Sequence, residues 1–386
     1  MRIRQVFIES FDDALKLVNK TQSCPIVHTL LAKKGFGISL YIEKIDNRAA
    51  AILKQEALAC GAEVSINEGV SRFKRGFSNA VLFASLRRLE LLKNKLASQP
   101  FELKDAARQI DDVINNASNP QKIFKCRQFS LDLKKPAVMG IINVDPNSFS
   151  GDGITDPDKA CQKAVEFENL GAKIIDLGAE SSRPGTALID YKSELKRLLP
   201  ALKKIRKAVK IPISIDTYKY ETSKAALDEG ADIINDIFAL SKGKEKLAKL
   251  ISDTKAGIIL MHSKGNPLNM QKKPQYKDCV KEVFDYLEEK KKNALGFGIE
   301  PDFISVDPGI GFAKTVDHNL SLIRSLKTFS WLGIITLGVS RKNFVRTVAG
   351  SSISSFVAAN FLGVLRGADI IRVHDVKETI EALRLL

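Results

Sequence analysis

The sequence predicts an α/β protein, a (β/α)₈ TIM barrel preceded by a smaller α/β domain. Three observations carry this prediction. Over residues 136–386, eight short apolar runs alternate with stretches of helical period, and each run ends in polar residues. Roughly 250 residues of such alternation is the usual size of an eight-stranded parallel barrel. Residues 1–120 do not show this repeat and are expected to form the smaller domain.

The composition is that of an ordinary globular protein. The 386 residues suffice for one large domain and a smaller one. Lys and Arg number 60 against 45 Asp and Glu, and the net charge of +15 favours association with anions without naming one. No stripe of alternating basic and aromatic residues points to a nucleic-acid surface. We therefore expect a solvated basic surface and no nucleic-acid partner.

The cysteines and the apolar runs indicate a cytoplasmic protein. The five cysteines are scattered and never stand at the spacing of zinc ligands, so we expect reduced thiols. The first residues lack the apolar core and the small-residue cleavage site of a signal peptide. No later apolar run approaches membrane-spanning length, so we expect no membrane partner.

The N-terminal domain is predicted from periodicity and stop signals, and its role is unknown. The run 79–84 is compatible with a strand or with the start of the following helix. The segment 115–121, rich in Asn, Ser and Pro, is the best candidate for a linker, and 121–135 would lead into the barrel. The other expected elements are strands at 37–45 and 62–67, a helix at 48–60 that ends at Gly61, and a helix at 86–97 that Pro100 ends.

The barrel elements follow one another as strand, polar loop and helix. The expected strands are 137–144, 173–177, 212–216, 232–237, 257–261, 303–306, 334–339 and 369–373. The expected helices are 156–170, 191–209, 218–229, 244–253, 276–297, 316–325, 354–366 and 376–386. A doubly wound open sheet is the competing architecture, but it would show a Gly-rich phosphate turn directly after its first strand, and none is present.

Polar side chains end each predicted strand, where parallel barrels hold their ligands. Asp216, Asn235 and Asp307 suit a flat heterocycle, because carboxylates and amides pair with the adjacent donors of a pyrimidine-like edge. Asp216 or Asp307 alone is equally compatible with a helix cap or a structural ion pair. Their occurrence together, in one order, favours a shared site.

A second group supplies donors of the kind that hold a phosphate or a diphosphate. It consists of Asn143, Arg183, Arg372 and His374. His374 alone would also be compatible with a buried histidine whose hydrogen bonds are satisfied. We therefore predict a site that takes a heterocycle bearing a phosphorylated group.

Residues 136–386 resemble the dihydropteroate synthases of the pterin-binding (β/α)₈ family. The matching motifs are Met139-Gly-Ile-Ile-Asn-Val, Glu180-Ser-Ser-Arg-Pro-Gly, Ser214-Ile-Asp-Thr, Asn235-Asp, Met261-His, Asp307-Pro-Gly-Ile-Gly-Phe, Ser340-Arg-Lys and Arg372-Val-His-Asp. They occur in order over the whole barrel. Residues 1–120 resemble, more weakly, the N-terminal extension of some members.

The resemblance implies condensation of (7,8-dihydropterin-6-yl)methyl diphosphate with 4-aminobenzoate, giving 7,8-dihydropteroate and diphosphate in folate biosynthesis. It also implies Mg²⁺, with Asn143 as ligand, and a homodimer. The implied catalytic residues are Asp216, Lys342, Arg372 and His374. The pterin would contact Asp216, Asn235, Met261, Asp307, Lys342 and Arg372; the diphosphate would contact Asn143, Arg183, Arg372 and His374; and 4-aminobenzoate would contact Phe149, Ser182, Pro184, Phe312, Lys314 and Asn343.

The first loop departs from the family pattern. Asp145 stands where the family usually has Thr, and Asn147 where it usually has Asp. We expect Asp145 to take over the acidic role of the missing carboxylate. We also expect an altered response to sulfonamides, which mimic 4-aminobenzoate.

Two other functions remain open from the sequence. A pterin-dependent methyltransferase of the same superfamily would keep the Asp and Asn cradle but would not need the Ser-Ser-Arg-Pro-Gly and Arg-Val-His-Asp motifs. A degenerate, non-catalytic pterin-binding barrel is the second alternative, suggested by the changed first loop.

Overall fold

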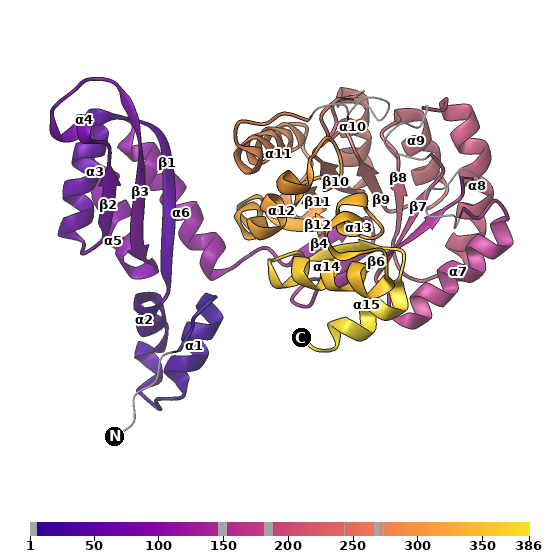
Figure 1. Ribbon diagram of the computed structural model, residues 1–386, viewed down its shortest axis with the longest axis horizontal. Coiled ribbons are helices and arrows are strands. Elements are labelled where there is room, and N and C mark those ends of the chain that lie inside the picture. Colours follow the sequence, from indigo (N-terminus) through magenta and orange to yellow (C-terminus); the bar gives the residue numbers. More distant parts are fainter. Residues whose placement is uncertain (1–5, 146–152, 181–187, 243, 266–270, 272–273) are drawn as a thin grey trace. The chain divides into compact units, whose positions relative to one another are not determined.

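The computed structural model describes residues 6–145, 153–180, 188–242, 244–265, 271 and 274–386. The chain divides into two units, Met1–Pro120 and Gln121–Leu386 (Figure 1).

The N-terminal unit is a three-stranded antiparallel sheet with helices on one face. Its strands are β1 (Gly37–Asp46), β2 (Glu63–Ile66) and β3 (Phe77–Ser85), in the order β1-β3-β2. Alternate residues of β3 are buried, among them Leu82. The helices are α1 (Phe11–Asn19), α2 (Pro25–Gly35), α3 (Asn47–Ala59), α4 (Glu68–Ser71), α5 (Leu86–Leu96) and α6 (Leu103–Ser118).

The sequence left one element of this unit open and misassigned another. Residues 79–84 form a strand, since they lie within β3. The expected linker at 115–121 is wrong for its first four residues, which form the last turn of α6. Burial of Ile110 and Ile114 in the core of the unit holds this turn in the helix.

Residues 121–135, which were expected only to lead into the barrel, contain a hairpin. Its strands are β4 (Ile123–Cys126) and β5 (Phe129–Asp132). The hairpin packs in one apolar cluster with the first residues of several barrel strands, among them Ile174, Ile233 and Ile370. Phe124 is fully buried there. The hairpin therefore closes the N-terminal end of the barrel.

Eight parallel strands close into a barrel in the order β10-β11-β12-β13-β6-β7-β8-β9, which confirms the predicted architecture and excludes the open sheet (Figure 1). The strands are β6 (Ala137–Asn143), β7 (Ile174–Gly178), β8 (Ile213–Asp216), β9 (Ile233–Asp236), β10 (Gly257–Met261), β11 (Ile304–Asp307), β12 (Ile334–Leu337) and β13 (Ile370–Val373). They are almost wholly buried because the inner face fills the barrel and the outer face packs on helices.

The surrounding helices are α7 (Pro157–Leu170), α8 (Tyr191–Ala208), α9 (Tyr220–Asp228), α10 (Lys244–Thr254), α11 (Cys279–Gly296), α12 (Val316–Arg324), α13 (Asn343–Ala349), α14 (Ile353–Leu365) and α15 (Val376–Leu383), with 3₁₀ turns at Pro301–Phe303 and Leu326–Leu332. Of the helices that the structure describes around the barrel, α13 alone was not predicted. All five cysteines are free thiols. Among the described residues, no single helix is both long enough and apolar enough to cross a membrane.

Candidate active site

The strand ends β6 to β9 bring three predicted residues to one level of the barrel mouth. Asn143 pairs in register with Gly178, Gly178 with Asp216, and Asp216 with Asn235. Register partners on parallel strands point to the same face of the sheet. A Cβ built on Gly178 would lie 3.4 Å from Oδ1 of Asn143 and 3.5 Å from Cβ of Asp216, so the glycine leaves room between them.

Arg372 crosses the interior of the barrel to two carboxylates. Its Nη2 donates to Oδ2 of Asp216 and its Nε donates to Oδ2 of Asp176, each at 2.5 Å. β13, which carries Arg372, is separated from β8 by β6 and β7, so the contact with Asp216 passes through the barrel interior. Asp216 and Arg372 were predicted to share the pterin site, and the structure brings them together.

Burial sets the charge state of Asp216. It raises the pKa of this carboxyl to about 7, against the pull of the Arg372 guanidinium, and the nearby charge of Asp176 acts in the same direction as burial. The pKa of Arg372 is raised because its two carboxylate partners outweigh its own burial. The site thus holds an acid that titrates near neutrality beside a fixed cation.

Of the Asn-Asp pair that ends β9, only Asn235 faces the mouth. Asn235 is the register partner of Asp216, whereas Asp236 points to the opposite face of the strand. The Asp236 carboxylate accepts the backbone N–H groups of Phe238 and Leu240 at 2.8 and 2.6 Å. Asp236 therefore shapes the next turn, and Asn235 remains the candidate ligand.

Asp307 ends β11 and is held by its own loop. Its carboxylate accepts the backbone N–H of Gly309 at 2.7 Å, and burial raises its pKa. Gly309 has φ of +68°, and a Cβ there would lie 1.8 Å from the carbonyl oxygen of His262. Only glycine fits this close approach. The Asp-Pro-Gly motif thus fixes the carboxylate of Asp307 at the mouth.

Lys342 lies over the same loop. Its Nζ donates to the carbonyl oxygen of Ile310 and lies 4.7 Å from the centre of the Phe312 ring. Burial lowers the pKa of Lys342 to about 8, while Asp307 works against that shift. Phe312 in turn packs on an apolar cluster that contains Met261. Lys342, Phe312 and Met261, all predicted site residues, therefore share one wall.

The loops after β12 and β13 are tied to each other. Ser340 Oγ lies 3.1 Å from Nδ1 of His374 and accepts the backbone N–H of His374 at 3.2 Å. Arg341 pairs with Asp375 at 2.6 Å. Asn343 is the first residue of α13, whose N-cap is Lys342.

Lys314 is buried, and its amine is engaged by its neighbours. Its Nζ lies 2.9 Å from Nδ1 of His262 and donates to the carbonyl oxygen of Phe312 at 3.0 Å. Burial lowers the pKa of Lys314 to about 7 and that of His262 to about 2, so His262 is neutral. In this arrangement, Lys314 braces the loop that carries Phe312.

Four predicted residues, Phe149, Ser182, Arg183 and Pro184, lie outside the described residues. The second loop is described at both ends. Oε1 of Glu180 accepts the backbone N–H of Ile189 at 2.7 Å, and Lys219 contacts both Glu180 and Glu194 at 2.9 Å.

Two features of the site were missed from the sequence. Asp176 lies inside the predicted strand 173–177 but was given no role, although a carboxylate inside the run Ile-Ile-Asp-Leu is the signal of a buried charge. Glu194 is buried in the first turn of α8, although an acidic residue in the first turn of a helix is ordinarily expected to be exposed. No sequence signal distinguishes Glu194 from a solvated helix residue.

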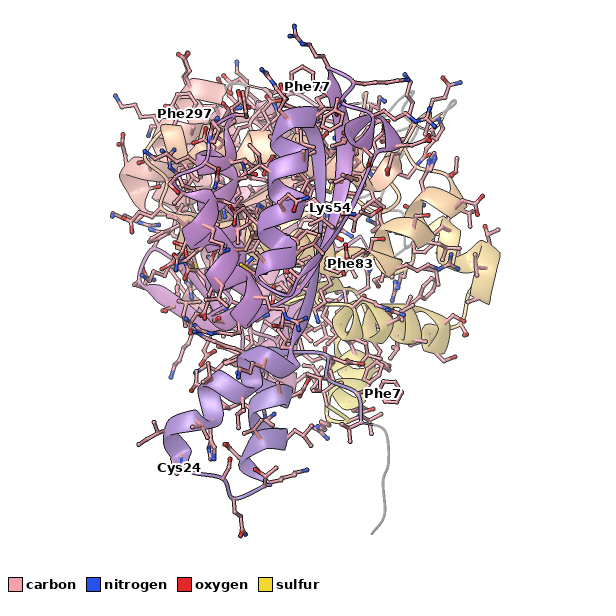
Figure 2. All side chains as sticks on the ribbon, turned by 90° about the vertical axis from the view of Figure 1, so that its left-hand side faces the viewer. Phe7, Cys24, Lys54, Phe77, Phe83 and Phe297 are labelled. Carbon is pink, nitrogen blue, oxygen red and sulfur yellow. The ribbon has the colours of Figure 1, made fainter. Side chains whose placement is uncertain are left out.

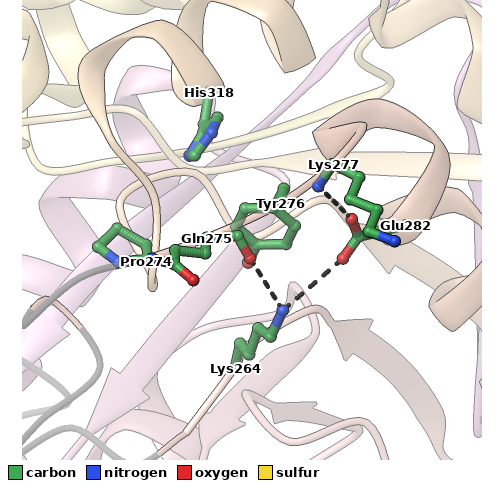
Figure 3. Close-up of a pocket in the computed structure, with 7 residues that line it drawn as sticks. All are labelled: Lys264, Pro274, Gln275, Tyr276, Lys277, Glu282 and His318. Atoms are coloured by element: carbon green, nitrogen blue, oxygen red, sulfur yellow. Dashed lines mark hydrogen bonds and ion pairs between the residues drawn. The ribbon is translucent and has the colours of Figure 1, made fainter.

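A hollow of about 680 Å³ lies apart from these residues (Figure 3). Lys264 reaches across it to the carbonyl oxygen of Gln275 at 3.0 Å and to Glu282 at 3.7 Å. Its other lining residues are Pro274, Tyr276, Lys277 and His318. None of the predicted site residues lines it.

The site is therefore the mouth of a closed barrel that gathers carboxylates, an amide and buried cations, groups that suit a flat heterocycle. The model of the family described as pterin binding enzyme matches residues 139–374, so the chain belongs to the pterin-binding enzymes. The match begins after the N-terminal unit.

Within that family the chain is a member of the dihydropteroate synthases, as its motifs indicated. It is 40% identical over 263 residues to the dihydropteroate synthase of Escherichia coli (strain K12), covering 67% of this chain and 93% of that relative. The structure of Yersinia pestis dihydropteroate synthase in a sulfonamide drug complex matches with a TM-score of 0.65 and 34% identity, covering 68% of this chain and 97% of that one. Burkholderia cenocepacia dihydropteroate synthase complexed with 7,8-dihydropteroate matches with a TM-score of 0.62 and 34% identity, over 69% and 95%.

Proposed function

We propose that the protein condenses (7,8-dihydropterin-6-yl)methyl diphosphate with 4-aminobenzoate, giving 7,8-dihydropteroate and diphosphate in folate biosynthesis. One observation carries the proposal: Asp216, Asn235, Asp307, Lys342 and Arg372 meet at one barrel mouth in a chain 40% identical to a dihydropteroate synthase. The relative crystallised with 7,8-dihydropteroate binds the product that this reaction would form.

The carboxylates and the amide would hold the pterin. Asp216 and Asp307 present acceptors to the ring N–H and amino groups, and Asn235 supplies both a donor and an acceptor. Met261 would pack near the ring, and Arg372 would lie against its face. These assignments rest on the shared mouth and on the family motifs.

The chemistry requires a stabilised leaving group and a stabilised cation. Asn143, Arg183, Arg372 and His374 would hold the diphosphate and offset its charge as the C–O bond breaks. The remaining methylene cation is conjugated with the ring, and an ionised Asp216 would stabilise it. The neutral amine of 4-aminobenzoate then attacks the methylene carbon and loses one N–H proton to the released diphosphate or to solvent, so a C–N bond replaces the C–O bond without a protein nucleophile.

The residues present fit a magnesium ion that arrives with the diphosphate. The described residues contain no cluster of three or more His, Cys, Asp or Glu side chains that could hold a metal alone. Mg²⁺ commonly keeps several waters and binds largely through substrate phosphates, so we propose that the amide oxygen of Asn143 would be its ligand on the protein side. When bound, the ion would neutralise charge on the diphosphate.

We place 4-aminobenzoate beside the two loops after β6 and β7. Phe149, Ser182 and Pro184 would contact it there, and Phe312 and Lys314 would approach from the loop after β11. Its carboxylate would lie near Asn343 at the start of α13. The buried amine of Lys314 already contacts His262 and Phe312, so we propose that Lys314 acts by bracing Phe312.

We propose a cytoplasmic homodimer, since the motifs are those of a family in which dimers are usual. Exposed apolar side chains on α13 and α14 support an interface there. They are Val348, Ile353, Leu362 and Leu365, exposed by 56%, 47%, 41% and 59%. Sedimentation of the wild type against Leu365→Glu tests this: a dimer that the charge converts to monomer supports it, and a monomeric wild type removes it.

The reaction is tested by incubating the purified protein with the dihydropterin diphosphate and Mg²⁺, with and without 4-aminobenzoate. We expect diphosphate release that depends on the amine and matches the dihydropteroate formed. Diphosphate release without dihydropteroate would contradict the proposal, as would pterin binding without any turnover.

A further inference from the structure

The Asp176 carboxylate accepts a hydrogen bond from the guanidinium of Arg372 at a position deeper in the barrel than the proposed pterin site. Asp176 pairs in register with Ser214, whereas Asp216 pairs with Gly178, so Asp176 lies two residues deeper along the barrel than Asp216. Its side chain is fully buried. Among the described residues, the side chain that hydrogen-bonds to Asp176 is that of Arg372, through which Asp176 can act on the mouth.

The two carboxylates hold different nitrogens of the same guanidinium. Asp176 takes Nε and Asp216 takes Nη2, so the plane of the group is fixed by two hydrogen bonds. Within the described part of the chain, the other carboxylate oxygen of Asp176, Oδ1, has no hydrogen-bond partner. The hydrogen bonding of Asp176 that the structure describes is therefore directed at Arg372.

This division matters when a pterin binds. In the free protein, one oxygen of Asp216 is engaged by Arg372. A pterin that pairs with Asp216 competes for that carboxylate, and an arginine held by Asp216 alone would lose its anchor. Because Asp176 holds Nε, Arg372 keeps its position while the Asp216 carboxylate forms hydrogen bonds to the ligand.

We propose that Asp176 is a positioning residue that holds Arg372 against the face of the pterin and so frees Asp216 to pair with the ring. The proposal rests on the proposed function for its ligand. In this role Asp176 acts through Arg372.

The protein contains a matched control for a purely structural ion pair. Asp232, at the foot of β9, is buried and accepts from Nη1 of Arg206 at 2.9 Å and from the backbone N–H of Ile213 at 3.0 Å. Like Asp176, it leaves Oδ1 without a partner among the described residues. It lies at the opposite end of the barrel strands from the mouth.

The experiment compares Asp176→Asn, Asp176→Ala and Asp232→Asn in the full-length protein. We measure the steady-state constants for both substrates, the thermal midpoint and the pH profile of kcat/KM. For Asp176→Ala we expect the KM for the dihydropterin diphosphate to rise about tenfold or more, with the KM for 4-aminobenzoate within about twofold of wild type. Asp176→Asn keeps an oxygen that accepts from Nε, so it should restore part of the loss.

The pH profile separates positioning from a loss of stability. Asp176 helps to raise the pKa of Asp216, so removing its charge should move the acid limb of kcat/KM to lower pH. Asp232→Asn should lower the thermal midpoint and leave both KM values and the acid limb unchanged. A wild-type KM and acid limb in both Asp176 variants overturns the proposal, and so does an equal rise in both KM values.

Failure of the proposed function would look different. A wild-type protein that forms no dihydropteroate refutes that function, whatever the variants do. Pterin affinity measured by fluorescence then tests Asp176 directly: we expect Asp176→Ala to bind the dihydropterin diphosphate about tenfold more weakly than Asp232→Asn. Equal affinities would overturn the positioning role.

Discussion

The barrel mouth and the N-terminal unit place their charged side chains in opposite ways. At the mouth, Asp216, Lys342 and Arg372 are withdrawn from water, and burial shifts the pKa values of Asp216 and Lys342 toward neutrality. In the N-terminal unit, charged residues pair at the surface, as Arg87 does with Glu90 at 3.1 Å. Surface pairs contribute about 0–1 kcal/mol, whereas breaking a buried pair costs about 3–5 kcal/mol. Buried charges of this kind mark a functional site.

The N-terminal unit shows a different unusual feature. Tyr41, Phe77 and Phe83 are 63%, 72% and 49% exposed, and Phe77 and Phe83 project from β3 in Figure 2. They are apolar side chains on a sheet whose other face carries the core. From this contrast we infer that the catalytic chemistry of this chain is concentrated in the barrel.

The largest effect is expected from Arg372→Met. This change leaves Asp176 and Asp216 buried without their cation, which costs about 3–5 kcal/mol of folding free energy. It also removes the positive charge that would stabilise the diphosphate leaving group, so kcat/KM should fall by about 10³. Urea unfolding and diphosphate release measure the two effects. Arg87→Met, in the N-terminal unit, should change neither by much, and equal effects of the two variants would contradict the contrast between buried and surface charges.

Gly309→Ala should come next. The added Cβ overlaps the carbonyl oxygen of His262 at 1.8 Å, so the loop has to move and the bond from Gly309 to Asp307 is lost. We expect a rise of about 10–100-fold in the KM for the dihydropterin diphosphate. Gly350→Ala is the matched control, because Gly350 also has a positive φ, +86°, but its nearest neighbour to the new Cβ lies at 4.0 Å. If Gly350→Ala raises this KM as much, the positive φ of the glycine, and not the overlap of the new Cβ with its neighbour, is responsible for the rise.

The pH dependence of kcat/KM should be bell-shaped. Asp216 must be ionised to stabilise the cation, and burial raises its pKa to about 7, so activity should fall about tenfold per unit as the pH drops below that value. Lys342 must keep its proton, and its pKa of about 8 predicts a second fall as the pH rises. In Lys342→Arg the alkaline limb should disappear, since a guanidinium does not titrate in this range. An alkaline limb that persists would assign it to another group.

Asp145 should give a smaller effect than the sequence alone suggests. Its buried carboxylate lies 2.9 Å from Nη1 of Arg197, which also donates to the carbonyl oxygen of Ala179 at 3.3 Å. This pairing offers a structural use for the acidic residue in the changed loop. We expect Asp145→Asn to lower stability by about 1–3 kcal/mol and turnover only a few-fold. If turnover falls about a hundredfold at unchanged stability, Asp145 instead has the acidic role inferred from the sequence.

The predictable part of the fold is the part that local patterns control. Each barrel strand is a short apolar run rich in β-branched residues, and β6, β7, β8, β9 and β11 end in Asn, Asp or Gly, so all eight were found. The β4–β5 hairpin was missed because its turn places Arg127, not glycine, at φ of +51°, so the usual turn signal is absent. The site is similar: strand-end residues were predictable, but the contact of Arg372 with Asp176 depends on barrel closure.

The smallest effect is expected from removing residues 1–120. The N-terminal unit has its own apolar core around Leu53, Leu82 and Leu89, and the barrel is closed below by the hairpin that contains Phe124. Because neither core borrows residues from the other, the fragment 121–386 should fold and keep kcat and both KM values within about threefold of the full chain. Matched assays and unfolding curves of the two proteins measure this. A fragment that folds but loses pterin turnover would show that the N-terminal unit takes part in catalysis, and the exposed side chains Tyr41 and Phe83 would then be the first to substitute.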